Sequence, residues 1–274
     1  MAQPLRITSR QNSRVKDAAR LRAGRERQRE GRFLIDGMRE IERAVAAGVR
    51  CIEAFVCEDV YDSHKGKATL DAILNSGAET FVVTRDVYSK LAFGEREDGI
   101  VVVAATPQRC LTDLQLSAQP LVAVLEGVEK PGNVGAILRS ADAAGVDAVV
   151  IADGRTDLYN PNTIRASLGT VFRANVCEAT SAETFDWLRA NNLSIVAARP
   201  DAEKSYTEID LTRGAAIVLG SEAAGLSDAW RGAEITPIRL PMHGMADSLN
   251  VSTTAAVLFY EALRQRSAPL SARR

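Results

Sequence analysis

Two chemically useful side chains, Asn133 and Arg139, lie in the stretch KPGNVGAILRSADAAG (130–145), directly after the apolar run LVAVLEGV (121–128). A strand, a glycine turn and a helix in succession commonly receive an anion at the turn. The guanidinium of Arg139 could hold a phosphate through two hydrogen bonds, or it could be a surface residue on an Ala/Gly-rich helix. The glycine spacing is not G-x-G-x-x-G and no G-K-[ST] occurs, so a dinucleotide or Walker phosphate loop is poorly supported.

A carboxylate, Glu222, follows a second buried strand. The apolar run AAIVLG (215–220) leads directly into Ser221 and Glu222. A carboxylate at the end of a buried strand is costly unless it is hydrated or paired. Active sites of open α/β sheets gather at the carboxyl ends of such strands. Glu222 is therefore a candidate site residue.

A third polar group lies in RLPMHGMADSLN (239–250), a loop of small and polar residues that precedes a helix-like segment. Ser248 and Asn250 bracket the expected helix start, where backbone N–H groups are free. We interpret Ser248 as the better cap, which leaves Asn250 for another role. His243, in the middle of the loop, is expected to be exposed to solvent.

These residues are placed by two successive α/β units, as alternating strand-like and helix-like segments indicate. In the second unit the strands are almost continuously apolar, which is typical of a parallel sheet buried on both faces. The first unit has expected strands at 32–37, 51–58, 80–84 and 99–105 and helices at 38–48, 63–77 and 86–93. The second has expected strands at 121–128, 147–152, 174–179, 194–199, 215–220 and 236–241, and helices near 133–145, 160–170, 182–191 and 249–266.

Composition narrows the class of protein. The chain has 274 residues, of which 46% are hydrophobic and 25% charged, as in ordinary globular proteins. It contains no apolar run of about 18 residues and no secretory signal at its start, so we expect no membrane association and a cytoplasmic location. The cysteines lack C-x-x-C spacing and the two histidines lie far apart, so no metal site is expected.

The charge is unevenly distributed. Residues 1–32 carry ten Lys and Arg against three acidic residues, a local charge of +7, so the remainder carries −8 of the total of −1. We expect a polar, Arg-rich helix over 8–30. Such a segment is either a handle for a polyanion or a solvated helix face, and composition alone does not separate the two.

Taken together, the three polar segments resemble the motifs of the SpoU (TrmH-like) family of RNA ribose methyltransferases, within the SPOUT class. The matching stretches are GNVGAILRSADAAG (132–145), IVLGSEAAGLSD (217–228) and LPMHGMADSLNVSTTAAVLFYEA (240–262). The resemblance covers roughly 120–266, and TIRASLGTVF (163–172) is similar to the stretch that the family places between its first two motifs. Residues 32–105 more loosely resemble a ribosomal-protein-like RNA-binding domain.

The resemblance implies an α/β fold in which a C-terminal SPOUT domain, with a parallel sheet and a deep trefoil knot, follows a smaller α/β substrate-binding domain. The implied boundaries are a basic N-terminal arm at 1–31, the RNA substrate-binding domain at 32–106, a linker at 107–119 and the methyltransferase domain at 120–268. The family works as a homodimer in which the partner subunit completes each site.

The resemblance also implies the chemistry. S-adenosylmethionine would be the cofactor, held by Gly220, Leu240 and Leu249. The catalytic set would be Arg139, Asn133, Glu222, Ser248 and Asn250. RNA contacts are expected from Arg165 and from arginines of the basic segment, namely Arg14, Arg20 and Arg32.

The implied reaction is methyl transfer to a ribose 2′-hydroxyl of structured RNA, with large-subunit ribosomal RNA favoured over transfer RNA. Two alternatives remain from the sequence: a transfer-RNA 2′-O-methyltransferase, and a non-catalytic RNA-binding or ribosome-assembly protein on the same fold. The complete set of motif side chains argues against the second. A nicotinamide-dependent enzyme is disfavoured by the missing glycine of its loop.

Overall fold

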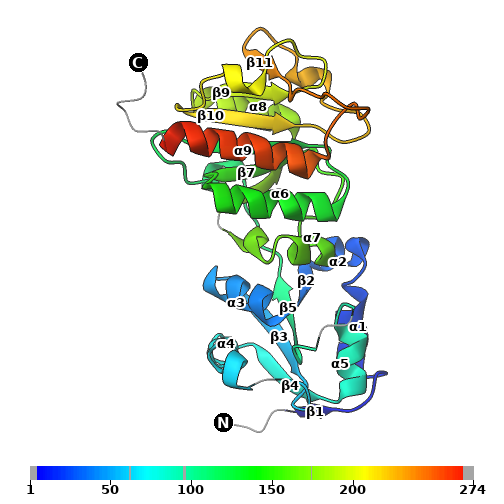
Figure 1. Cartoon of the computed structure of the whole chain (residues 1–274). Coiled ribbons are helices and arrows are strands. Elements are labelled where there is room, and N and C mark those ends of the chain that lie inside the picture. The colour runs from blue at the N-terminus through cyan, green and yellow to red at the C-terminus, as the bar shows by residue number, and fades with distance from the viewer. Residues whose placement is uncertain (1–4, 62, 95–96, 174, 268–274) are drawn as a thin grey trace. The chain divides into compact units, whose positions relative to one another are not determined.

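The computed structural model describes residues 5–61, 63–94, 97–173 and 175–267. The chain divides into two compact units, which are described separately below. The first contains Met1–Gln108 together with Asp157–Arg173, and the second contains Arg109–Thr156 together with Ala174–Arg274. Figure 1 follows the chain through both units by colour.

The first unit is built, over its described residues, on a five-stranded mixed sheet with the strand order β1-β4-β3-β5-β2. Strand β5 runs antiparallel to β2 and β3, and the other neighbours are parallel. The strands are β1 (Leu5–Ile7), β2 (Arg32–Asp36), β3 (Cys51–Val56), β4 (Glu79–Val83) and β5 (Ile100–Ala105). The helices are α1 (Ser13–Arg20), α2 (Gly24–Glu30), α3 (Met38–Ala46), α4 (Ser63–Asn75), α5 (Arg85–Leu91) and α7 (Pro161–Ala166).

The basic N-terminal segment differs from the single helix predicted over 8–30. It forms the short strand β1 and two helices, α1 and α2. Val15, Ala18 and Leu21 are each at most 2% exposed and belong to the hydrophobic core of the first unit. Their spacing of three residues places them on one helix face, which packs inward, while Arg14 and Arg20 of the same helix stay exposed. The segment is therefore part of the folded unit and not a detached arm.

The segment 157–173 also differs from expectation, because it packs within the first unit although the sequence predicted a continuous domain over 120–268. The ring of Phe33 in β2 stacks on Tyr159 and Phe172, with centroids 4.7 and 5.9 Å apart. Nε of Arg27, which is 4% exposed, donates to Oδ2 of Asp157 at 2.5 Å. Aromatic stacking and a buried ion pair thus fix the segment to the first unit.

The second unit contains, in the part of the chain that the structure describes, a six-stranded parallel sheet with the order β11-β9-β10-β6-β7-β8. In the centre of the sheet Val124 pairs with Val218 on one side and Val150 on the other. The strands are β6 (Leu121–Glu126), β7 (Ala148–Ala152), β8 (Val176–Ala179), β9 (Ser194–Ala198), β10 (Ala215–Leu219) and β11 (Ile235–Ile238). The helices are α6 (Pro131–Ala144), α8 (Ser181–Ala190) and α9 (Val251–Ser267).

Helices cover both faces of this sheet. Helices α6 and α9 pack side by side, as Figure 1 shows. Leu188 of α8 and Trp230 share a core cluster with alternate sheet residues such as Val122 and Val124. All six strands end at the same edge because they are parallel, so the segments that follow β6, β10 and β11 meet there.

Candidate active site and cofactor pocket

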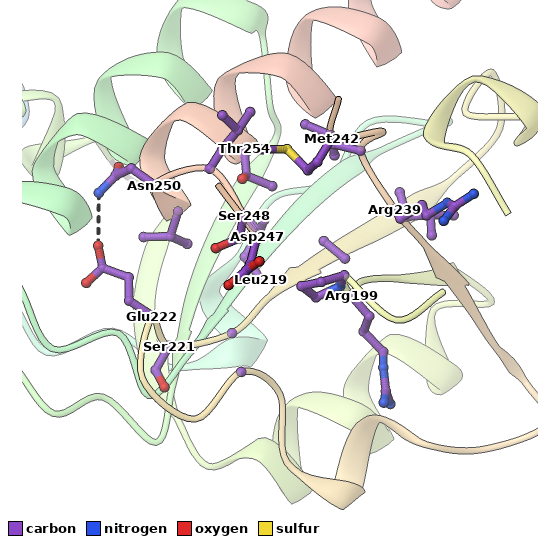
Figure 2. A pocket seen from close by; sticks show the side chains of 18 of the residues that line it. Arg199, Leu219, Ser221, Glu222, Arg239, Met242, Asp247, Ser248, Asn250 and Thr254 are labelled. Atoms are coloured by element: carbon purple, nitrogen blue, oxygen red, sulfur yellow. Dashed lines mark hydrogen bonds between the residues drawn. The ribbon is translucent and has the colours of Figure 1, made fainter. Parts of the chain in front are cut away.

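Three sequence-predicted residues meet at the carboxyl edge of the second unit's sheet. Asn133 lies in the first turn of α6, Glu222 in the loop after β10, and Asn250 directly before α9. Nδ2 of Asn133 donates to Oε1 of Glu222 at 2.5 Å, and Nδ2 of Asn250 donates to the same oxygen at 2.9 Å. Figure 2 shows Glu222 and Asn250 pointing toward each other. The motif positions thus form one hydrogen-bonded cluster.

Glu222 is the centre of this cluster. Its other carboxylate oxygen, Oε2, lies 3.3 Å from Nζ of Lys130, a residue that sequence reasoning had not singled out. The side chain of Glu222 is 26% exposed. A carboxylate that accepts from two amides and pairs with an ammonium is held in place, and it fixes both amides in turn. This arrangement suits the alignment of a polar substrate group.

Asn250 is also the cap of α9, which corrects the sequence prediction that Ser248 takes this role. Oδ1 of Asn250 accepts from the backbone N–H of Ser252 at 2.9 Å and from its hydroxyl at 2.6 Å. The carbonyl of Asn250 accepts from the N–H of Thr254. An asparagine offers an acceptor and a donor on one amide, so a single residue caps the helix and reaches Glu222.

The loop after β10 depends on a tight turn at Ser221–Gly225. The N–H of Gly225 donates to the carbonyl of Ser221 at 2.9 Å, and the reverse bond measures 3.2 Å. Gly225 has a φ of 68°, which suits glycine. A Cβ on Gly220 would lie 2.5 Å from the carbonyl oxygen of Gly225 and 2.6 Å from the N of Leu226. Only glycine therefore permits this close backbone approach.

A cavity of 540 Å³ opens beside the cluster. It is lined by the loop after β10, by the end of β11 and by the segment that leads into α9. Its lining includes all three residues predicted to bind the cofactor, Gly220, Leu240 and Leu249, and also Ser248. The volume lies in the range of small-molecule sites, and its walls combine leucines with backbone groups of the turns.

The far side of the cavity is basic. Figure 2 places Arg199 and Arg239 there, away from Glu222. Arg199 donates to Asp201 through Nε at 3.0 Å and Nη2 at 2.8 Å. This side-chain hydrogen bonding lowers the pKa of Asp201 below its ordinary value. The predicted exposure of His243, in the loop before α9, is confirmed.

Arg139 is not part of the cluster. It lies on α6, is exposed, and makes no hydrogen bond or ion pair to any residue that the structure describes. Six residues after Asn133, a helical side chain lies about 9 Å along the axis and about 120° around it. Within one chain the guanidinium therefore points away from the Asn133 amide.

The arginines predicted to contact RNA lie in the first unit, and each has a partner there. Arg14 pairs with Glu53 and Glu79, Arg20 with Asp17, and Arg32 with Glu30. Arg165 donates to the carbonyl of Phe93 at 3.3 Å. Neighbouring carboxylates thus offset much of the positive charge counted in the sequence.

Among the described residues, no group of three or more His, Cys, Asp or Glu side chains could hold a metal ion. Within the same residues, no helix is long and apolar enough to cross a membrane.

Comparison with known proteins confirms the predicted family. The model of the SpoU rRNA methylase family matches residues 120–260, and that of the MRM3-like substrate binding domain matches residues 12–102. The first match spans the cluster, the cavity and all six parallel strands. The chain belongs to the SpoU rRNA methylase family.

Individual relatives extend over nearly the whole chain. The 23S rRNA (guanosine(2553)-2′-O)-methyltransferase RlmP of Bacillus subtilis is 30% identical over 93% of this chain and 97% of its own. The crystal structure of an RNA 2′-O ribose methyltransferase is 43% identical, with a TM-score of 0.82 over 96% of this chain and 99% of the other. The AdoMet complex of AviRb from Streptomyces viridochromogenes is 28% identical, with a TM-score of 0.83 over 93% and 98%.

Proposed function

We propose that this protein transfers a methyl group from S-adenosylmethionine to a ribose 2′-hydroxyl of large-subunit ribosomal RNA. The observation that carries the proposal is the cluster of Glu222, Asn133 and Asn250 beside a cavity of 540 Å³ in a member of this family. Relatives named as 23S rRNA 2′-O-methyltransferases support the substrate class. A ribosomal RNA substrate would place the protein in the cytoplasm.

The cavity fits S-adenosylmethionine. Leu240 and Leu249 offer apolar surface for a flat base, while the turn at Gly220 presents backbone groups. A Cβ on Gly220 would displace that turn, so the glycine preserves the shape of the wall. A solved relative carries this cofactor. When bound, S-adenosylmethionine supplies an electrophilic methyl group on a positively charged sulfur.

The protein's own task is to align the acceptor hydroxyl. Glu222 orients the amide of Asn133 through the 2.5 Å hydrogen bond. We assign Asn133 and Ser248 to the ribose. The role that we assign to the Arg139 guanidinium is to hold the adjacent phosphate and to stabilise charge on the acceptor oxygen.

A homodimer is part of the proposal. Arg139 is exposed on α6, which packs against α9, where Tyr260 is 52% exposed. An outward-facing Arg139 is suited to complete the site of a second copy. We also propose that the second unit contains the deep trefoil knot of the SPOUT class. The return of the chain from the edge strand β11 to α9, beside α6, is compatible with such a path.

The proposal is tested by methyl transfer from labelled S-adenosylmethionine to ribosomal RNA, large subunits and transfer RNA from a strain that lacks this protein. Mapping of 2′-O-methylation should find label at one nucleotide of large-subunit RNA. Label confined to transfer RNA would show that the substrate is transfer RNA and not ribosomal RNA. An absence of label from all three, despite cofactor binding, would indicate a non-catalytic RNA-binding protein.

A further inference from the structure

A second buried carboxylate, Glu126, lies at the same sheet edge as Glu222. It is the last residue of β6 and is 6% exposed. Its Oε2 accepts from the backbone N–H of Ser227 at 2.7 Å. Its Oε1 accepts from the hydroxyl of Ser227 at 2.6 Å and from that of Ser181 at 2.9 Å. Three hydrogen bonds thus offset the cost of burying this group.

The support of Glu126 extends to the neighbouring strands. Ser181 begins α8, and its N–H donates to Oδ2 of Asp153 at 3.1 Å. Asp153 follows β7 with a φ of 46°, a left-handed conformation that is unfavourable for most side chains. The hydrogen bond to Asp153 thus holds Ser181 in place, and Ser181 in turn holds one side of Glu126.

Ser227 ends the loop that forms one wall of the cavity. The loop begins at Gly220, turns at Ser221–Gly225, and carries Glu222 toward Asn133 and Asn250. Gly220, Ser221, Glu222 and Gly225 line the cavity, whereas neither Glu126 nor Ser227 is among its lining residues. The turn holds the near end of the loop, and Glu126 holds the far end.

We propose that Glu126 is a positioning residue for cofactor binding, which acts by fixing the loop 220–227 through Ser227. The inference rests on the proposed use of S-adenosylmethionine. Glu126 lies behind the wall and influences the cofactor only through the loop. Loss of its bonds frees Ser227, and the wall then samples conformations in which Gly225 and Glu222 are displaced. Binding must select the ordered conformation, so apparent affinity falls.

Substitutions of Glu126 and Ser227 remove different numbers of these hydrogen bonds. In Glu126→Gln the remaining carbonyl oxygen can still accept from the N–H of Ser227. The new amide can donate to the two serine hydroxyls, which rotate to accept. In Glu126→Ala all three bonds are lost. In Ser227→Ala the backbone bond remains and one hydroxyl bond is lost.

The experiment measures the dissociation constant of S-adenosylmethionine by calorimetry on the full-length protein. Each variant is measured at a temperature where circular dichroism shows it to be folded. We expect weakening of at least about tenfold for Glu126→Ala, and of about threefold for Ser227→Ala. Glu126→Gln should restore most of the affinity.

The matched control is Glu261→Ala. Glu261 is also a buried carboxylate of the second unit, 9% exposed, but its partners Arg264 and Gln265 lie on its own helix, α9. This variant should lose stability without losing affinity for the cofactor.

Four outcomes are decisive. Equal affinity in the wild type, Glu126→Ala and Ser227→Ala overturns the inference, as does an equal loss in Glu261→Ala. If Glu126→Ala does not fold, Ser227→Ala alone decides, and unchanged affinity overturns the inference. A wild-type protein that does not bind S-adenosylmethionine at all would contradict the proposed function itself, which is a different result from binding that ignores Glu126.

Discussion

The amide of Asn250 donates to Oε1 of Glu222 at 2.9 Å while its carbonyl oxygen caps α9 by accepting from the N–H of Ser252 at 2.9 Å. One side chain thereby ties the start of the last helix to the loop after β10. The position of the cluster and the position of the helix depend on each other. Substitutions that keep the helix cap and remove the hydrogen bond to Glu222 can separate the two roles of Asn250.

Asn250→Asp should inactivate the protein without unfolding it. Aspartate caps a helix as well as asparagine does, and its charge suits the helix N-terminus, so these effects offset part of the repulsion described next and the protein should stay folded. The new carboxylate would face Glu222, and two like charges at this distance repel. We expect methyl transfer to fall by about a hundredfold, as measured with labelled cofactor.

The control for this change is Asn250→Ser, which keeps a capping oxygen and loses the amide donor. It should lower activity less than Asn250→Asp, because no repulsion is added. Equal activity of the wild type and Asn250→Asp would show that the hydrogen bond to Glu222 has no part in the reaction.

Arg139→Ala should abolish methyl transfer and leave stability and cofactor binding intact. Arg139 is exposed and has no partner among the described residues, so the free energy of unfolding should stay within about 0.5 kcal/mol. Loss of a group that stabilises developing charge should lower the rate by at least about a hundredfold. The matched control is Arg213→Ala, because Arg213 is also an exposed arginine and lies just before β10. This variant should remain active. Retained activity in Arg139→Ala would refute the assignment.

The sequence predicted which residues form the cluster better than it predicted how they are arranged. Asn133, Glu222 and Asn250 follow apolar strands, and strands of a parallel sheet end at one edge, so their meeting was expected. The separation of Arg139 from Asn133 follows from helix geometry and not from their closeness in sequence. The dual role of Asn250 was missed because the helix was expected to begin at 249, which made Ser248 the cap, whereas α9 begins at Val251.

Some other features of the structure were detectable in the sequence but were not predicted from it. Val15, Ala18 and Leu21 repeat every three residues within the basic segment, yet its ten Lys and Arg residues dominated the prediction. Glu126 is the one charged residue of LVAVLEGV, so the argument that identified Glu222 applied to it equally. The packing of 157–173 into the first unit depends on contacts distant in sequence, which no local pattern shows.

Gly220→Ala should disrupt the cavity wall. The added Cβ would meet backbone atoms of Gly225 and Leu226, which cannot rotate away. We expect a loss of about 1–3 kcal/mol in the free energy of unfolding and a weakening of S-adenosylmethionine binding by at least about tenfold. In the control Gly232→Ala the nearest atom would be Cδ1 of Ile235 at 3.9 Å, so both quantities should stay unchanged. Similar effects of the two substitutions would exclude a special role for the turn.

The thiols should differ sharply in reactivity. Burial raises the pKa of Cys177 to about 12, and it also raises the pKa values of Cys51 and Cys57 above their ordinary range. Cys110 is exposed. Because the thiolate is the reactive form, iodoacetamide at pH 8 should label the native protein once, at Cys110. Mass spectrometry of digested protein gives the sites, and rapid labelling of Cys177 would show that β8 opens.

Arg27→Met should release the segment 157–173 from the first unit. Arg27 pairs with Asp157 and also donates to the carbonyls of Leu21 and Arg22 at 2.7 and 2.8 Å. Its removal leaves those two carbonyls without this donor, and it leaves the largely buried carboxylate of Asp157 with the N–H of Tyr159 but no positive charge beside it. Breaking one side of such a pair costs about 3–5 kcal/mol. We expect a lower midpoint in urea unfolding and faster amide hydrogen exchange in peptides that cover 157–173.

Arg10→Ala provides the contrast, because Arg10 and Asp86 form an ion pair whose side chains are 51% and 63% exposed. Solvent screens such a pair, so its loss should cost less than about 1 kcal/mol and leave exchange in 157–173 unchanged. If Arg27→Met also left that exchange unchanged, the aromatic stack of Phe33, Tyr159 and Phe172 would be sufficient to hold the segment. The buried pair would then contribute to stability without determining where the segment packs.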